Sequence, residues 1–142
     1  MVSETSVIDA ALMARLQGDA ALVALLPDGI WLDEAPAGSK QYGLVQRDDD
    51  SVGDVQVFGG RGFEDYVFRV AAVVLSTTEG DVRAAAARID ALLQDQPLAV
   101  DGYVWMTTYR VDYVRVTEKD DLDASIRWLH RGGRYRLQMA LA

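Results

Sequence analysis

The sequence has no cysteine among its 142 residues and only one histidine, His130. These two absences exclude disulfide bonds, thiol chemistry and Cys-ligated metal sites, and they argue against a multi-histidine metal site. No apolar run approaches the ~18 residues of a membrane-spanning helix, and the acidic start of the chain is unlike a secretory signal. We therefore expect a soluble cytosolic single domain over residues 1–142, with no cofactor and no membrane partner.

Acidic residues are missing from the end of the chain. The last 19 residues hold four arginines and no Asp or Glu, whereas the first 65 residues carry a net charge of −8, which is the charge of the whole chain. This asymmetry has two interpretations: ordinary surface charge that keeps a small domain in solution, or a polar molecule that stacks against copies of itself or a partner. The net charge argues against tight binding of nucleic acid, which needs basic patches.

Apolar residues at helical spacing predict three helices. The first covers about 8–16, a short one covers 20–26, and the strongest begins after Thr77 or Thr78 and keeps the pattern through 82–93. Stretches with alternating or β-branched apolar residues predict strands. These strands are 30–32, 42–47, 63–75, 103–117, 125–130 and 134–141.

Glycines and alternation refine the strand predictions. The segment 48–65 reads as a long β-hairpin arm with a glycine-rich tip, and Arg131-Gly132-Gly133 reads as a hairpin turn. Strict alternation places the aromatic side chains of the strand 103–117 in one row, and the apolar residues of the last strand opposite its arginines. The aromatic row consists of Trp105, Tyr109 and Tyr113; the last strand has Tyr135, Leu137 and Met139 opposite Arg134 and Arg136.

The order of these elements predicts the fold class. Helix, strands, helix and strands follow one another without an internal repeat or linker. This order favours an α+β domain with a mostly antiparallel β-sheet, two main helices packed on one face, and the long β-hairpin arm.

Four features invite a chemical interpretation, and each also has a structural one. Asp48-Asp49-Asp50 could hold a hard cation or form a solvated loop, and the glycines of 59–62 could cradle a phosphate or form a flexible turn. His130 could act as a general base with Asp123 or Ser125, or lie at a hairpin edge or interface. The aromatic row could stack nucleobases or serve as core and interface anchors. No nucleophile–base pair is evident, so we expect no enzymatic activity.

Five short segments, taken in order, point to a known family. They are GDAALVALL at 18–26, GIWLDEAP at 29–36, YGLVQ at 42–46, YVFRV at 66–70 followed by the helix to 93, and DLD at 121–123 before GRYRL at 133–137. In their order and spacing they resemble the tail terminator, or tail completion, proteins of long-tailed bacteriophages over most of the chain. The chain departs from the family pattern at Lys40-Gln41 and in the long segment 48–65.

The resemblance implies a structural virion protein that forms a hexameric ring, caps the tail tube, ends its polymerisation and joins the tail to the head. The implied partners are copies of the same chain, the tail tube protein and the head–tail connector protein, with DNA passing through the ring without specific binding. The implied location is the head-proximal end of the virion tail, after assembly in the host cytoplasm. Another phage neck protein, such as a head–tail connector or adaptor, is the alternative.

A ring needs head-to-tail contacts between unlike surfaces of each subunit. Because four arginines without a local acid repel one another, we expect carboxylates from 48–50 or 118–123 of the adjacent subunit to pair with them. The β-prone part of the 48–65 arm is the second expected contact. The candidate interface residues are Arg127, Arg131, Arg134, Arg136, Asp48, Asp49, Asp50, Val55, Val57 and Phe58.

Overall fold

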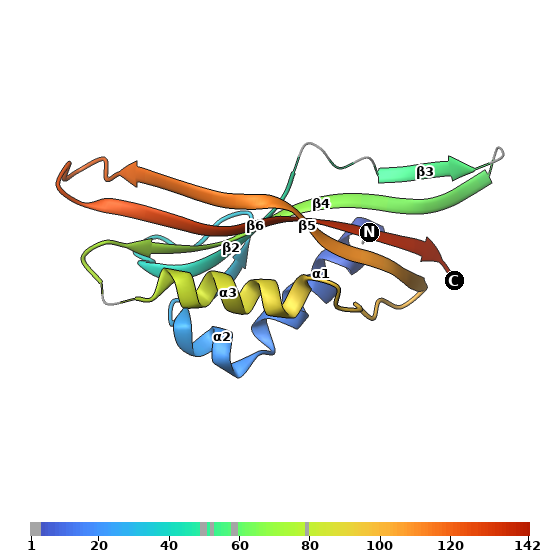
Figure 1. Ribbon diagram of the computed structural model, residues 1–142, viewed down its shortest axis with the longest axis horizontal. Helices are drawn as coiled ribbons and strands as arrows, with labels where there is room; N and C mark the ends of the chain where they lie inside the picture. The colour runs from blue at the N-terminus through green and yellow to red at the C-terminus, as the bar shows by residue number, and fades with distance from the viewer. Residues whose placement is uncertain (1–3, 49–50, 52, 58–59, 79) are drawn as a thin grey trace.

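A six-stranded sheet with all three helices on one side forms the domain (Figure 1). The computed structural model describes residues 4–48, 51, 53–57, 60–78 and 80–142. The strands are β1 (Ile30–Leu32), β2 (Gln41–Arg47), β3 (Gly53–Val57), β4 (Gly60–Leu75), β5 (Tyr103–Lys119) and β6 (Arg127–Leu141). Their order is β1-β2-β4-β6-β5, with β3 paired to the first part of β4, and every pairing except β1–β2 is antiparallel. The predicted α+β class and the hairpin arm of β3 and β4 are therefore confirmed.

The helices are α1 (Glu4–Gln17), α2 (Ala20–Leu25) and α3 (Val82–Leu93). Their apolar faces are buried as the spacing predicts; the buried residues are Ile8, Leu12, Leu16, Leu22, Val82, Ala85, Ile89 and Leu93. Helix α3 begins at Val82, after Thr77 and Thr78 as predicted, but neither threonine is its N-cap. Thr78 instead donates its hydroxyl to the Leu75 carbonyl in the turn after β4, and Asp81 caps the helix by accepting from the Ala84 amide.

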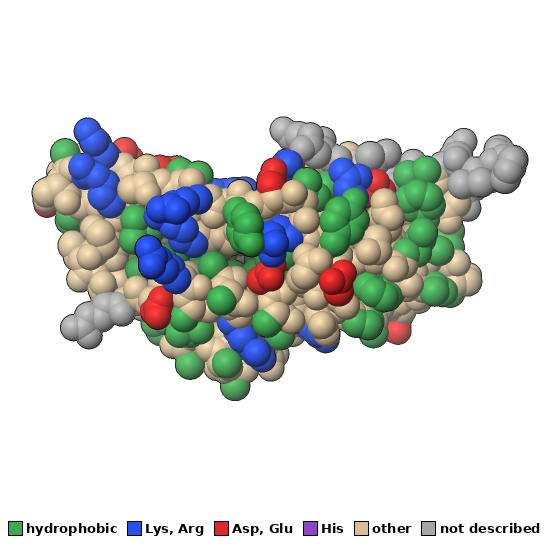
Figure 2. Space-filling model, viewed as in Figure 1, with side chains coloured by type: hydrophobic (Ala, Val, Ile, Leu, Met, Phe, Trp, Pro, Cys, Tyr) green, Lys and Arg blue, Asp and Glu red, His purple; other side chains and the backbone are tan. Residues whose placement is uncertain are grey.

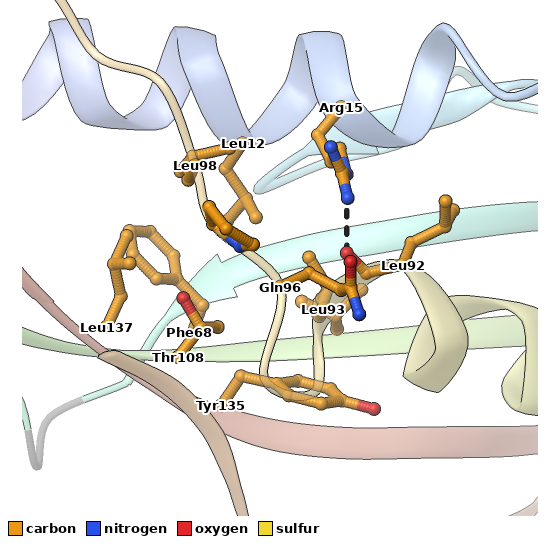
Figure 3. A pocket seen from close by; sticks show the side chains of 12 residues that line it. Leu12, Arg15, Phe68, Leu92, Leu93, Gln96, Leu98, Thr108, Tyr135 and Leu137 are labelled. Atoms are coloured by element: carbon orange, nitrogen blue, oxygen red, sulfur yellow. Dashed lines mark hydrogen bonds between the residues drawn. The ribbon is translucent and has the colours of Figure 1, made fainter. Parts of the chain in front are cut away.

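The main core lies between the helices and the inner face of the sheet, which we define as the face the helices cover. Phe68, Val70 and Leu137 are at most 2% exposed there. Where α1 meets the end of α3, Arg15 Nε donates to the Leu92 carbonyl over 3.3 Å, so a cation caps the C-terminus of α3 (Figure 3). The cavity beside this contact measures about 10 Å³, room for one water at most. It is a packing gap and not a substrate pocket.

The predicted turn at Arg131-Gly132-Gly133 is wrong, because β6 runs straight through it. Gly132 and Gly133 pair with Ala71 and Val70 of β4 in the middle of the sheet. A Cβ atom on Gly132 would lie 2.0 Å from the Val70 carbonyl oxygen. Glycine is therefore required here by close approach of two strands and not by a turn.

The predicted single row of aromatic side chains on β5 is also wrong. Register shifts between Trp105 and Thr107, and between Arg110 and Asp112, each insert one extra residue opposite β6. Each bulge reverses the alternation that follows it. Trp105 therefore lies on the inner face, Tyr109 opposite Arg136 on the outer face, and Tyr113 on the inner face again.

Candidate functional site

The outer edge of the sheet exposes an apolar strand. Within the described part of the chain, β5 pairs with β6 and has no strand on its other side. Its exposed apolar side chains are Val104, Met106, Tyr109, Val111, Tyr113 and Val116, with Tyr113 74% exposed. A long unpaired edge strand with exposed apolar side chains is typical of a protein–protein contact.

The four arginines of β6 do not share one face. Arg134 and Arg136 lie on the outer face, opposite the buried Tyr135, as the alternation predicts. Arg127 and Arg131 belong to the inner-face register, so they do not extend the outward face of Arg134 and Arg136. The reason is that β6 continues through Gly132 without a turn. Successive side chains of one strand point to opposite faces of the sheet, and this alternation decides on which face each arginine lies.

Arg134 has carboxylate partners inside its own chain. Its Nε lies 2.8 Å from Oδ1 of Asp112 on β5, and its Nη1 lies 3.1 Å from Oδ2 of Asp48 at the end of β2. Its guanidinium therefore bridges the edge strand β5 and the segment after β2. Asp48, predicted to pair with an arginine of another subunit, is paired within the subunit.

Arg136 is likewise paired within the subunit. Its Nη1 lies 2.7 Å from Oδ2 of Asp65, whose side chain is only 7% exposed. A buried carboxylate that loses its cation carries a large desolvation penalty. Arg134 and Arg136 thus hold the outer face of the sheet together, and the premise that they lack a local acid is wrong.

Two other predicted interface residues, Val55 and Val57, lie in strand β3 of the arm, and Arg127 lies beside the β5–β6 turn. Arg127 donates to the carbonyls of Ala124 and Ile126, and so braces the β5–β6 turn. Val55 pairs with Phe63, and the backbone of Val57 pairs with Gly60. Asp49, Asp50 and Phe58 lie outside the described residues.

His130 is buried in the sheet and not placed for base catalysis. Its Nε2 lies 3.7 Å from Oε2 of Glu118, while Asp123 accepts from Ser125 and not from the histidine. Burial lowers the pKa of His130; Glu118 opposes this shift, and Arg69 and Arg131 add to it. The ring is therefore neutral at pH 7 and acts as a packed side chain.

A groove of about 560 Å³ lies between α3 and the β5–β6 hairpin. Arg83 of α3, Arg115 of β5 and Arg131 of β6 line it, together with Tyr113. Figure 2 shows Lys and Arg side chains gathered where the hairpin passes the beginning of α3. Sequence reasoning missed Arg83 and Arg115, because only the pairing of Arg115 with Arg131 and the packing of α3 bring these arginines together.

The arginines of this groove have no carboxylate partner in the part of the chain that the structure describes, because Asp90, which also lines the groove, is bound by Arg110. Arg131 donates to the Val116 carbonyl over 3.0 Å and lies 3.4 Å from the Thr117 hydroxyl, but no described carboxylate pairs with Arg83, Arg115 or Arg131. Burial lowers the pKa of Arg131, and the neighbouring Arg115 and Arg83 lower it further. The groove is therefore suited to an anionic partner.

Metal-binding clusters and membrane-spanning helices are absent from the residues that the structure describes. No group of three or more His, Cys, Asp or Glu side chains could hold a metal ion among the residues that the structure describes. None of the described helices is long and apolar enough to cross a membrane.

Comparison with known proteins identifies a family. A solved structure from the virion of a native gene transfer agent particle matches with a TM-score of 0.65 and 20% identity, covering 97% of this chain and 99% of that chain. A second solved structure, which has no functional name, matches with a TM-score of 0.58 and 15% identity, covering 98% of this chain and 96% of its own. At these identities both matches show a shared fold.

No curated protein sequence matches the chain significantly. The model of the family described as "Tail completion protein gp17" matches residues 10–130, which is most of the chain. The chain therefore belongs to the tail completion protein gp17 family, and it is a structural component of a phage-type tail.

Proposed function

We propose that this chain forms a hexameric ring at the head-proximal end of the tail, where it caps the tail tube, ends its polymerisation and joins the tail to the head. The observation that carries the proposal, beside family membership, is the exposed apolar edge strand β5. A subunit that exposes such an edge is stabilised when another surface covers it. Assembly takes place in the host cytoplasm, before the tail is joined to the head.

The shape of the subunit supports head-to-tail contacts. The β5–β6 turn and the β3–β4 hairpin project at opposite ends of the molecule (Figure 1). A contact between unlike ends of successive subunits is heterologous. It forms a closed ring when the rotation that relates one subunit to the next is a whole fraction of 360°. The arm with Val55 and Val57, together with Arg127 and Arg131, belongs to the surfaces available for these contacts.

The charge of the subunit fits the passage of DNA through the ring. A net charge of −8 gives the assembled ring an overall negative charge. Non-specific binding of DNA is driven by the release of counterions when cationic side chains contact phosphates. A ring without such contacts binds DNA weakly, so DNA can slide through it. The proposed partners are therefore copies of this chain, the tail tube protein and the head–tail connector protein.

The test combines oligomer mass with tube growth. Light scattering should give six times the subunit mass, and addition of the protein to polymerising tail tube protein should stop elongation. Val104→Lys with Val111→Lys, at positions 54% and 41% exposed on β5, should abolish both effects while circular dichroism stays unchanged. Val23→Lys, at an exposed position on α2, is the matched control and should abolish neither.

The outcomes separate the proposal from its alternative. A protein that binds the head–tail connector but leaves tube growth unchanged would favour a neck adaptor. A protein that stays monomeric with and without tail tube protein would overturn the ring.

A further inference from the structure

The groove between α3 and the β5–β6 hairpin, lined by Arg83, Arg115 and Arg131, calls for an anionic partner. We propose that this groove is the receiving surface of the subunit contact, and that its occupant is the β5–β6 turn of a second copy of this chain, residues 120–125. This inference rests on the proposed ring and names the two surfaces that would build it.

The proposed occupant has the complementary charge. The turn contains Asp120, Asp121 and Asp123, and residues 121–125 are exposed. The indole of Trp128 and the backbone amides of Leu122 and Asp123 lower the pKa of Asp120 by donating to it, and Ser125 lowers the pKa of Asp123 in the same way. These two carboxylates therefore stay ionised well below neutral pH, and they face cations that have no partner in their own subunit.

The occupant also has an apolar anchor. Leu122, at the apex of the turn, is 98% exposed. The groove offers it Ala86 and Ala87 of α3 and the ring of Tyr113. Arg110 fixes that ring, with its guanidinium carbon 4.1 Å from the ring centroid, while its Nη1 lies 2.5 Å from Asp90. An exposed leucine flanked by carboxylates matches an apolar surface flanked by three arginines, where the acidic lining residue Asp90 is already paired with Arg110.

The turn and the backbone of the groove are organised before contact. Asp120 accepts from two backbone amides of the turn and from the Trp128 indole, which fixes the shape of the turn. The three arginines extend from a helix and two paired strands. The conformational entropy lost on contact is therefore mainly that of the arginine side chains and Leu122, and not that of the backbone.

The turn and the groove of one subunit cannot meet each other. Arg115 lies in β5, and the strand continues without interruption to Lys119 before the turn begins. Four residues of extended strand separate the arginine from the turn by about 13 Å. The turn therefore points away from its own groove, and the contact must be between subunits, unlike surface to unlike surface.

Cysteine cross-linking tests the contact cleanly, because the chain has no native cysteine. The variant carrying Leu122→Cys and Ala87→Cys should form a ladder of disulfide-linked oligomers on mild oxidation. Each single variant should give dimers at most, since it offers one thiol per subunit. Leu122→Cys with Ala21→Cys, an exposed alanine on α2, is the matched control and should give no ladder.

Charge reversal tests the energetics. Arg83→Glu with Arg115→Glu, and separately Asp121→Lys with Asp123→Lys, should each reduce the assembled fraction at least tenfold, and wild-type assembly should weaken as salt rises. The chain that carries all four substitutions should regain assembly. The side chains of Arg83 and Arg115 make no hydrogen bond to a described residue, so folding should be unaffected, with circular dichroism as the check.

The outcomes distinguish this contact from the ring itself. Rings that survive both reversals, together with the absence of a cross-linked ladder, would leave the ring standing and overturn this contact. A wild-type chain that neither assembles nor cross-links, with or without tail tube protein, would overturn both.

Discussion

The two faces of the sheet bury β4 by different means. On the inner face, Phe68 and Val70 are each 1% exposed because helices cover them. On the outer face, Val67 and Val73 are just as buried, at 0% and 1%, although every helix lies on the other side (Figure 1). The outer face must therefore be covered by side chains of the sheet itself.

Long aromatic and charged side chains provide that cover. Tyr42 and Trp128 meet edge to face, with ring centroids 6.3 Å apart, and Arg134 and Arg136 bind acids of neighbouring strands. Long side chains can shield apolar surface along their stems while their ends remain polar. Arginines on a sheet face that no helix covers can therefore stabilise the fold. Their outward position in the alternation pattern is not sufficient evidence that they form a subunit interface.

The largest expected effect comes from crowding the outer face at Gly132. Gly132→Ala should lower the free energy of unfolding by on the order of 3 kcal/mol, because its Cβ would meet the backbone of β4. Urea denaturation followed by circular dichroism measures it. Gly133→Ala is the control: its Cβ would meet the movable side chains of Tyr135 and Arg110 at 3.0 and 3.1 Å, so a smaller loss is expected. Equal losses would contradict the close-approach argument.

The next effect concerns the ion pair of the outer face. Arg136→Glu should destabilise the monomer by about 3 kcal/mol, because it places a second carboxylate beside the buried Asp65. The neutral pair Arg136→Gln with Asp65→Asn should cost much less, since no charge is left unpaired. Denaturation curves of the wild type, the Arg136→Glu variant and the neutral double variant measure the free energy of unfolding of each. If Arg136→Glu were as stable as the wild type but failed to assemble, the arginine would belong to the subunit contact instead.

A matched pair of valines on β4 compares the two faces directly. Val70→Ala on the inner face should cost about 2 kcal/mol, because helices hold the cavity open. Val73→Ala on the outer face should cost about 1 kcal/mol, because flexible neighbours can move into the space. Both residues are 1% exposed, so burial does not distinguish them. A larger loss at Val73 would show that the outer face is as rigid as the inner one.

The smallest effect is the pH dependence from His130. Its pKa is lowered from 6.5 by burial, so the unfolded state takes up the proton first as the pH falls. The free energy of unfolding should therefore decline as the pH drops below about 6.5, in the way linkage requires. Unfolding of the wild type and of His130→Gln between pH 7.5 and 5.5 should show this decline only in the wild type. A parallel decline in both proteins would assign it to other groups.

Local sequence patterns predict most of the helices and strands and the fold class correctly. Helical spacing located the buried faces of α1 and α3, and alternation placed Tyr135 and Leu137 of β6 toward the helices. Local signals of this kind suffice, since burial of one face is encoded at the period of the element. The order of segments also identified the family, which the match over residues 10–130 confirms.

The contacts between side chains of different elements depend on the three-dimensional fold. Gly132 and Gly133 look like a turn in sequence, but the close approach of β4 makes them the middle of a strand. Bulges in β5 reverse its alternation, and no residue type in the sequence marks their positions. The partners of Arg134 and the grouping of Arg83 with Arg115 depend on register and on the packing of α3. Such contacts join residues far apart in the chain, so local pattern cannot specify them.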